Sequence, residues 1–186
     1  MLEGPRVRLR SFELSDVSEI MKYWNKVELR RLLGSLDRGP VARSEEEDWI
    51  RSTWKQRQER KAYTFAVETT ADSKLIGGTG IFSIEWTSRS AEAGISIYNP
   101  EYWGKGYGVD ALNLVLGFAF QDLNLSRVGL EVFDFNKRAY KCYLKVGFKE
   151  TGRRRKARFI EGHYHDSVMM DILNEEWQRK NRLTGT

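Results

Sequence analysis

The chain has 186 residues, of which 40% are hydrophobic, and a net charge of +5. This size and apolar content predict a single domain spanning residues 1–186, and the modest charge permits an anionic partner without requiring one. One cysteine, Cys142, excludes an intrachain disulfide, and no apolar run approaches the roughly 20 residues of a membrane-spanning helix. The first residues contain no apolar stretch of the secretory kind, so we expect a cytoplasmic protein with no membrane partner.

The first part of the chain is predicted to contain one strand and two helices. Apolar residues alternate with arginines over 6–12, which is the period of two that is typical of a half-buried strand. A helix is expected over 15–24, where apolar residues recur at helical spacing. A second helix is expected after Ser44, which together with Glu47 has the form of a capping box. The segment 30–43, which contains glycines and a proline, is predicted to be a loop.

The remainder of the chain is predicted to alternate strands with two helices. Apolar alternation bounded by polar turns predicts six further strands, over 63–69, 74–84, 91–98, 127–133, 149–160 and 164–173. The first three are expected to form an antiparallel meander. Helices are expected over 108–122 and 136–147, since apolar residues recur there at helical spacing. The last two strands are expected to form a hairpin that turns at Glu161 and Gly162.

Three glycines at alternate positions, Gly104, Gly106 and Gly108, stand at the start of the first of these two helices. The first N–H groups of a helix have no intrahelical partner and its N-terminus is electropositive, so this loop is suited to an anion such as a pyrophosphate. It is not the dinucleotide fingerprint, whose third glycine would fall at Val109, and not a P-loop, which requires Ser or Thr after Lys105. Spacing alone leaves open a glycine-rich turn that binds nothing.

The segment from Trp103 to Gly108, Trp-Gly-Lys-Gly-Tyr-Gly, resembles the pyrophosphate loop of the GNAT superfamily of N-acetyltransferases, Gln/Arg-x-x-Gly-x-Gly/Ala. Trp103 departs from the general pattern but is similar to the branch of ribosomal-protein N-terminal acetyltransferases and spermidine acetyltransferases. Three further segments resemble the family in the expected order, namely 7–17, 136–152 and 159–173. This resemblance spans nearly the whole chain and implies an acetyl-CoA-dependent N-acetyltransferase.

The resemblance implies an α/β (α+β) fold with a mixed, mostly antiparallel twisted sheet of about seven strands flanked by helices. In this fold the fourth strand, here 91–98, splays from the fifth, here 127–133, and its unpaired edge can bond the pantetheine arm of acetyl-CoA as an added strand would. Ordinary sheet pairing of this edge is the alternative. The implied contacts with this co-substrate, including backbone contacts from the fourth strand, are Ser96, Ile97, Trp103, Gly104, Lys105, Gly106, Tyr107, Gly108, Val109, Asn136 and Tyr143.

Acetyl transfer to an amine requires a neutral amine, stabilisation of an oxyanion and a proton for the departing thiolate. A lysine-like amine has a pKa of about 10.4, so we expect a carboxylate to accept its proton, directly or through water. Glu92 is the first choice, with an exposed strand-end charge as its alternative role, and Glu85 and Asp134 are lesser candidates. The resemblance implies that Tyr143 is the acid, with simple packing as the alternative. Backbone amides of strand 91–98 are the expected oxyanion donors.

No metal ion is expected in this mechanism. His163 and His165 lie two residues apart without companion ligands, so we expect them to have turn and strand roles. Cys142 is expected to be a small buried hydrophobe, because direct attack by the amine requires no acyl-enzyme.

The sequence indicates the type of reaction more clearly than the identity of the acceptor amine. In this fold the early helices and the last hairpin shape the acceptor site, so Trp24, Trp49, Trp54 and the acidic residues 45–48 are candidates, with core packing or a solvated helix start as alternatives. A protein N-terminal amine, as in the ribosomal-protein branch, is the leading expectation. Spermidine, another polyamine or another small amine is the alternative, although the basic run 153–158 is expected to disfavour a cation.

Two functions of other classes remain open at this point. The basic run would also suit a catalytically inactive module that binds RNA or the ribosome, although the run has no aromatic stacking platform beside it. An acyl-CoA sensor that binds the co-substrate without an acceptor is the second. The resemblance also admits association with the ribosome and a homodimer as partners.

Overall fold

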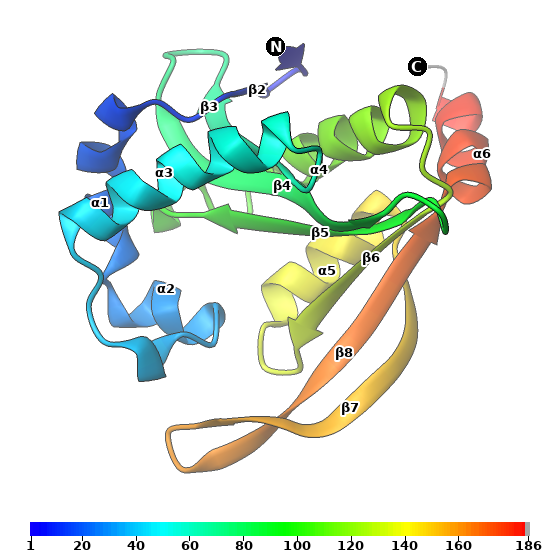
Figure 1. Cartoon of the computed structure of the whole chain (residues 1–186). Helices are drawn as coiled ribbons and strands as arrows, with labels where there is room; N and C mark the ends of the chain where they lie inside the picture. The colour runs from blue at the N-terminus through cyan, green and yellow to red at the C-terminus, as the bar shows by residue number, and fades with distance from the viewer. Residues whose placement is uncertain (185–186) are drawn as a thin grey trace.

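The computed structural model describes residues 1–184, with side chains through Arg182. Its eight strands form one sheet in the order β1-β2-β3-β4-β5-β6-β8-β7, in which every neighbouring pair is antiparallel except β5 and β6 (Figure 1). The mixed, mostly antiparallel sheet is therefore confirmed. The strands are β1 (Leu2–Glu3), β2 (Val7–Arg10), β3 (Tyr63–Thr69), β4 (Leu75–Glu85), β5 (Ser90–Ile97), β6 (Arg127–Phe133), β7 (Lys149–Ile160) and β8 (His163–Leu173).

Helices cover both faces of this sheet. Neighbouring residues of β3 point to opposite faces, so that Ala66 joins one buried cluster and Val67 the other. The first cluster contains residues of α1 (Val17–Trp24), α2 (Val27–Leu32) and α3 (Arg43–Gln58). The second and larger cluster contains residues of α4 (Tyr107–Gly117), α5 (Lys137–Val146) and α6 (Asn174–Thr184). A π-helical turn, Phe118–Asp122, continues α4, and 3-10 turns form at Leu14–Asp16, Leu36–Arg38 and Pro100–Tyr102.

The two halves of the sheet separate between β5 and β6. These parallel strands pair only where 90–92 face 127–129, after which no further pairing joins them. Beyond that point the strands diverge, and β6 pairs with β8 of the long β7–β8 hairpin, whose turn contacts α2 through an ion pair between Glu161 and Arg31 (Figure 1). The predicted splay is thus present, and within residues 1–184 no strand pairs with this edge of β5 over 93–97.

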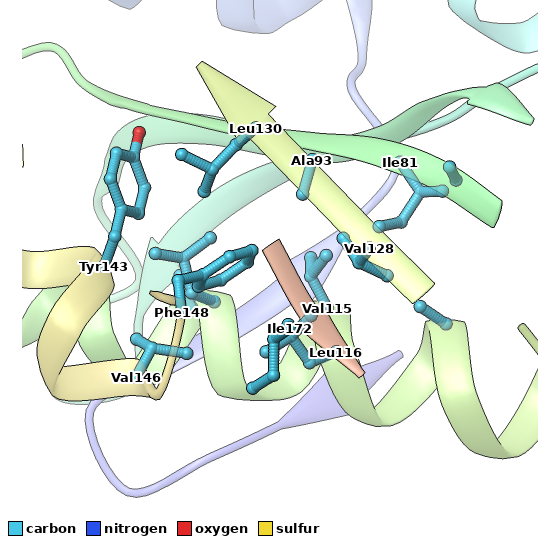
Figure 2. Packing of buried hydrophobic residues seen from close by; sticks show 14 of the residues in the cluster. Ile81, Ala93, Val115, Leu116, Val128, Leu130, Tyr143, Val146, Phe148 and Ile172 are labelled. Atoms are coloured by element: carbon cyan, nitrogen blue, oxygen red, sulfur yellow. The ribbon is translucent and has the colours of Figure 1, made fainter. Parts of the chain in front are cut away.

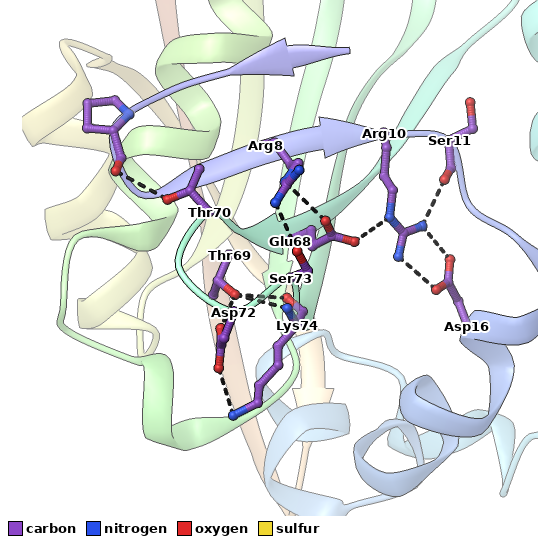
Figure 3. Close-up of polar contacts among 11 residues, drawn as sticks. Arg8, Arg10, Ser11, Asp16, Glu68, Thr69, Thr70, Asp72, Ser73 and Lys74 are labelled. Atoms are coloured by element: carbon purple, nitrogen blue, oxygen red, sulfur yellow. Dashed lines mark hydrogen bonds and ion pairs between the residues drawn. The ribbon is translucent and has the colours of Figure 1, made fainter.

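The start of the chain is anchored by a network of charged side chains (Figure 3). Arg10 donates two hydrogen bonds to the carboxylate of Asp16, at 2.8 and 2.9 Å, and one to Glu68 at 2.7 Å. The hydrogen bond to Asp16 is the main reason that the pKa of Arg10 is raised. Nearby, Asp110 at the start of α4 accepts hydrogen bonds from the backbone N–H groups of Arg6 and Val7. The network fixes the N-terminal strand against the beginning of α4.

Two predictions about the first 60 residues are wrong. The segment 30–43 is not a continuous loop, because α2 includes Arg30 and a 3-10 turn follows it. The capping box does not begin at Ser44. Helix α3 starts at Arg43, two residues earlier than expected, and the backbone N–H of its cap, Ala42, donates to Glu45 Oε2 at 2.6 Å. The bond from the cap N–H to a glutamate three residues later therefore forms at Ala42 and Glu45 instead of Ser44 and Glu47. The sequence pattern alone does not distinguish these two registers.

The second half of the chain follows the sequence prediction closely. Asn136 caps α5, since its side chain accepts a hydrogen bond from the N–H of Ala139, and Gly147 ends the helix with a φ of 119°. The hairpin turns at Glu161 and Gly162, which both have positive φ. The sequence did not predict β1 or α6. No helix among residues 1–184 is long and apolar enough to cross a membrane.

Candidate active site

Two cavities meet at the splay between β5 and β6. The first, which we call the groove, has a volume of about 450 Å³ and lies between β5, the glycine loop and α5. The second, which we call the cleft, has a volume of about 820 Å³ and lies between β4, β5, β6 and the first helices. They share seven lining residues: Leu32, Leu33, Ile95, Ser96, Asn136, Ala139 and Tyr143. A ligand in the groove can therefore reach a ligand in the cleft only beside these residues.

The glycine loop forms one end of the groove. Gly104 and Gly106 have φ values of 74° and 91°, which other residues adopt only with strain. Gly108 serves a different purpose, because a Cβ there would lie 3.4 Å from Cys142 Sγ, at the contact of α4 with α5. Arg6, which the sequence did not single out, donates from Nη1 to the carbonyl of Lys105 at 3.3 Å. The loop thus presents the first amides of an eleven-residue helix to the groove.

Helix α5 adds positive charge along the groove. Lys137, Arg138, Lys141 and Lys145 all line it, and the guanidinium of Arg138 lies 3.5 Å from the ring centre of Trp103. Sequence reasoning missed these four residues, although lysines at positions 137, 141 and 145 recur at a spacing that places them on one helix face. A glycine loop at a helix N-terminus and a row of cations fit a ligand that carries several phosphates.

The exposed backbone edge of β5 runs between the two cavities. The N–H of Tyr98 donates to the carbonyl of Ile76 at 2.8 Å, so the backbone groups of alternate residues, Ser96 included, face β4. Those of Ile95 and Ile97 face the splay. The main chain of Ser96 is therefore engaged in the sheet, whereas that of Ile97, the other residue of this strand predicted to contact the co-substrate, faces the splay.

Two further observations define this edge. The carbonyl of Ile97 accepts a hydrogen bond from the indole of Trp103 at 2.8 Å, which fastens the glycine loop to the strand. The side chain of Ser96 lines both cavities, and its buried hydroxyl oxygen has no hydrogen-bond partner among residues 1–184. A buried hydroxyl of this kind is normally satisfied, so its position fits contact with a polar ligand.

Tyr143 lies on α5 at the junction of the cavities. Its ring packs edge-on against Phe148 at 5.9 Å, and its hydroxyl points away from Phe148 and Val146 (Figure 2). Burial raises the pKa of Tyr143, so the phenol remains protonated at neutral pH. Burial also raises the pKa of the Cys142 thiol to about 11, which keeps this cysteine from acting as a thiolate nucleophile.

Glu92 lies in the cleft, on the same face of β5 as Ser96. Burial raises the pKa of its carboxyl, the charges of Glu131 and Asp171 raise it further, and Arg127 opposes them. The two lesser candidates for the base border neither cavity. Glu85 is exposed at the end of β4, and Asp134 lies 3.3 Å from the ring nitrogen Nδ1 of His165. The structure therefore brings Glu92 and Tyr143 to one cleft and leaves the alternatives outside it.

Aromatic side chains form much of the cleft wall. Trp24, Trp49, Phe82, Tyr98 and Phe133 all contribute to it. Of the other residues considered for the acceptor site, Trp54 donates its indole N–H to a backbone carbonyl at 2.8 Å, outside the cleft, and residues 45–48 do not line it. Apolar walls with few polar groups are typical of small-molecule sites.

Several arginines of the basic run 153–158 on β7 form ion pairs with carboxylates, which reduces the positive charge that the run presents. Arg153 pairs with Glu150 at 2.8 Å, Arg154 with Glu131 at 2.8 Å, and Arg158 with Asp37 at 3.2 Å. Arg154 alone in this run lines the cleft. Carboxylates thus neutralise three of the five cations in the run, the one at the cleft included, which weakens the expectation that the run disfavours a cationic acceptor. The same pairing reduces the positive charge that an RNA-binding module would use.

The sequence profile of the family described as "Acetyltransferase (GNAT) domain" matches residues 6–149, more than three quarters of the chain. The chain belongs to this family. It is thus an acetyl-CoA-dependent GNAT N-acetyltransferase, and the groove fits this co-substrate. No three His, Cys, Asp or Glu residues gather as metal ligands within the described part of the chain.

Individual relatives and solved structures agree with the family. The spermidine N(1)-acetyltransferase of Vibrio cholerae is 36% identical over 117 residues, which are 63% of this chain and 66% of that protein. A putative ribosomal N-acetyltransferase, YdaF of Bacillus subtilis, is 30% identical over 58% of each chain. The structure of a spermidine N-acetyltransferase from Vibrio cholerae in complex with CoA and spermine superimposes with a TM-score of 0.82 and 29% identity. That match covers 94% of this chain and 99% of the other.

Proposed function

We propose that this N-acetyltransferase acetylates a polyamine of the spermidine type. The observation that carries the proposal is a cleft that joins the groove and combines aromatic walls with two carboxylates, Glu92 and Glu131. Amines of this type are cations at neutral pH, and carboxylates together with aromatic faces bind cations. The resemblance to spermidine acetyltransferases in both sequence and structure supports the same acceptor.

The groove residues would hold acetyl-CoA along β5. Bound acetyl-CoA supplies an acetyl thioester. The amides of the glycine loop and the cations of α5 would bind its phosphates, while the backbone groups of Ile95 and Ile97 that face the splay would hold the pantetheine arm. We also propose that residues 1–186 act as one domain, because a single sheet runs from Leu2 to Leu173.

Glu92 would accept the proton of the attacking amine. The amine is charged at neutral pH, with a pKa of about 10.4 in solution, and only its neutral form attacks. A carboxyl whose pKa is raised by burial is a stronger base than an ordinary glutamate, which suits it to accept this proton. Its place on the cleft face of β5 puts it on the acceptor side of the splay.

Tyr143 would donate a proton to the leaving thiolate. The residue reaches both cavities from α5, and its raised pKa keeps the hydroxyl protonated as a donor. Transfer from a phenol with a raised pKa to a thiolate is uphill, so positioning is the main contribution of this side chain. The unpartnered hydroxyl of Ser96 lies at the same junction and would contact the reacting groups from the strand side.

A protein N-terminal amine is the second candidate acceptor. The likeness to a putative ribosomal N-acetyltransferase favours it, but that match spans a smaller share of the chain than the match to the spermidine enzyme. A peptide terminus carries one charge at its reacting end and offers nothing specific to the second carboxylate of the cleft. Thiol release from acetyl-CoA, measured with spermidine, N-terminal peptides and aminoglycosides in turn, distinguishes these acceptors. We expect the highest kcat/KM with spermidine, and release only with peptides would contradict the proposal.

A further inference from the structure

Glu131 is the second carboxylate of the cleft, and its two oxygens have different partners. Oε2 accepts a hydrogen bond from Ser167 at 2.8 Å, and Ser167 is only 2% exposed. Oε1 pairs with Arg154 at 2.8 Å, where the Arg154 side chain is 63% exposed. Ser167 therefore holds the carboxylate in place, while Arg154 can leave for solvent at little cost, since exposed ion pairs contribute about 0–1 kcal/mol.

The position of Glu131 relative to Glu92 follows from the pairing of β5 with β6. Glu92 is opposite Gly129, and Glu131 is two residues further along β6 on the same face. The charge of Glu131 raises the pKa of Glu92, so the two carboxylates are close enough to interact across the start of the splay. Two nitrogens joined by three or four methylenes are about 5–6 Å apart when extended, given bond lengths of about 1.5 Å. One polyamine in the cleft can therefore present one nitrogen to each of the two carboxylates.

We propose that Glu131 binds the second ammonium of the acceptor, which displaces Arg154 from the carboxylate. The inference rests on the proposed polyamine acceptor and names the residue that selects it over a monoamine. Arg154 occupies the position of a substrate cation when the cleft holds none, and the acceptor replaces one positive charge with another.

The charge balance around the two carboxylates agrees with this exchange. Arg127 is engaged with Asp171 at 2.8 Å, so it does not compete for Glu131. The reacting amine loses its proton before it attacks and becomes neutral, whereas the second ammonium stays charged throughout. The second ammonium therefore requires a carboxylate partner throughout the reaction, and Glu131 is placed in the cleft to provide it.

The test compares acceptors that differ by one ammonium. Thiol release is measured at saturating acetyl-CoA with spermidine, propane-1,3-diamine and propylamine, and the result is the ratio of kcat/KM for each polyamine to that for propylamine. This ratio cancels effects on the shared chemistry, including any effect of Glu131 on the pKa of Glu92. The variants are Glu131→Gln, Arg154→Gln and, as a matched control, Glu150→Gln, which breaks the Glu150–Arg153 ion pair outside the cleft.

We expect Glu131→Gln to lower the ratio about tenfold, mainly through a higher KM for the polyamines, as for loss of one charge-assisted hydrogen bond. Arg154→Gln is expected to raise the ratio several-fold, because it removes the competing cation, and a merely structural ion pair would not produce this opposite sign. Glu150→Gln is expected to leave the ratio at its wild-type value. A wild-type ratio in Glu131→Gln would overturn the inference while the proposed function stands. Absence of thiol release from the wild-type enzyme with spermidine would instead overturn the proposed function, and the inference with it.

Discussion

The carboxylate of Glu92 lies against the backbone of Gly129, so that a Cβ on Gly129 would stand 2.6 Å from Glu92 Oε1. The two residues are direct partners in the short parallel pairing of β5 and β6. Gly129 therefore leaves the space that the proposed base occupies. The contact depends on the absence of a side chain at one position in β6, immediately before the strands diverge.

Gly129→Ala is expected to displace the Glu92 carboxylate and to lower kcat at least tenfold, because misplacing a catalytic group by about 1 Å can cost a factor of 10². The affinity for acetyl-CoA, measured by calorimetry, should stay within twofold of wild type, since Gly129 does not line the groove. Gly117→Ala on α4 is the control. Apart from its own helix backbone, the nearest atom to its added Cβ is Trp177 Cζ2 at 3.8 Å, so activity should persist. Wild-type kcat in Gly129→Ala would count against the role of Glu92.

Tyr143→Phe is expected to lower kcat by about 10², which is typical of a lost general acid, with little change in the affinity for acetyl-CoA. Tyr140→Phe is a matched control on the same helix. The Tyr140 hydroxyl donates to Glu150 at 3.0 Å on the exposed side, away from the cavities. Steady-state kinetics give kcat for both variants. Equal kcat values for the two would refute the acid role of Tyr143.

Gly106→Ala is expected to raise the Kd for acetyl-CoA about tenfold, equivalent to about 1.4 kcal/mol. An L residue at a φ of 91° is strained, and relief of the strain would turn the loop amides away from the groove. Gly39→Ala provides the control, because Gly39 also has a positive φ, 69°, and lies outside both cavities. Both variants should lose stability, but calorimetric titration should show weaker binding only for Gly106→Ala. Equal Kd values would argue that the loop does not bind the co-substrate.

Glu46 on α3 is 3% exposed, and burial raises its pKa to about 7. The folded protein therefore binds an extra proton between about pH 4.5 and 7, and the free energy of unfolding falls as the pH rises through this window. Glu46→Gln should stabilise the protein at pH 8 by roughly 2–3 kcal/mol and have little effect at pH 4.5. Thermal melts at both pH values measure this difference. Glu47→Gln, which removes a surface ion pair with Arg43, should show no such gain.

Local patterns in the sequence were sufficient for most elements and for the glycine loop. The cap at Asn136 and the end of α5 at Gly147 depend on neighbouring residues alone, so they were predicted correctly. The register of the α3 cap could not be predicted, because Ala42 has no side-chain acceptor and its backbone N–H is the bonded group. A pattern search for Ser or Thr caps cannot detect that arrangement.

The site residues that sequence reasoning missed depend on contacts between distant segments. Arg6 reaches the carbonyl of Lys105 across 99 positions, and Arg154 reaches Glu131 only once β7 and β6 both pair with β8. The backbone orientation of Ser96 also required the observed pairing with β4. These relationships follow from sheet register, which is set by the whole fold and cannot be read from one segment.

The proposed polyamine acceptor is tested most directly by a competition between two amines in one reaction. Acetyl-CoA labelled in its acetyl group is incubated with the enzyme and equal concentrations of spermidine and a peptide with a free N-terminus. Mass spectrometry then shows which amine carries the label. We expect the label to accumulate on spermidine at least ten times faster than on the peptide. Label found on the peptide, with spermidine unmodified, would contradict the proposed acceptor.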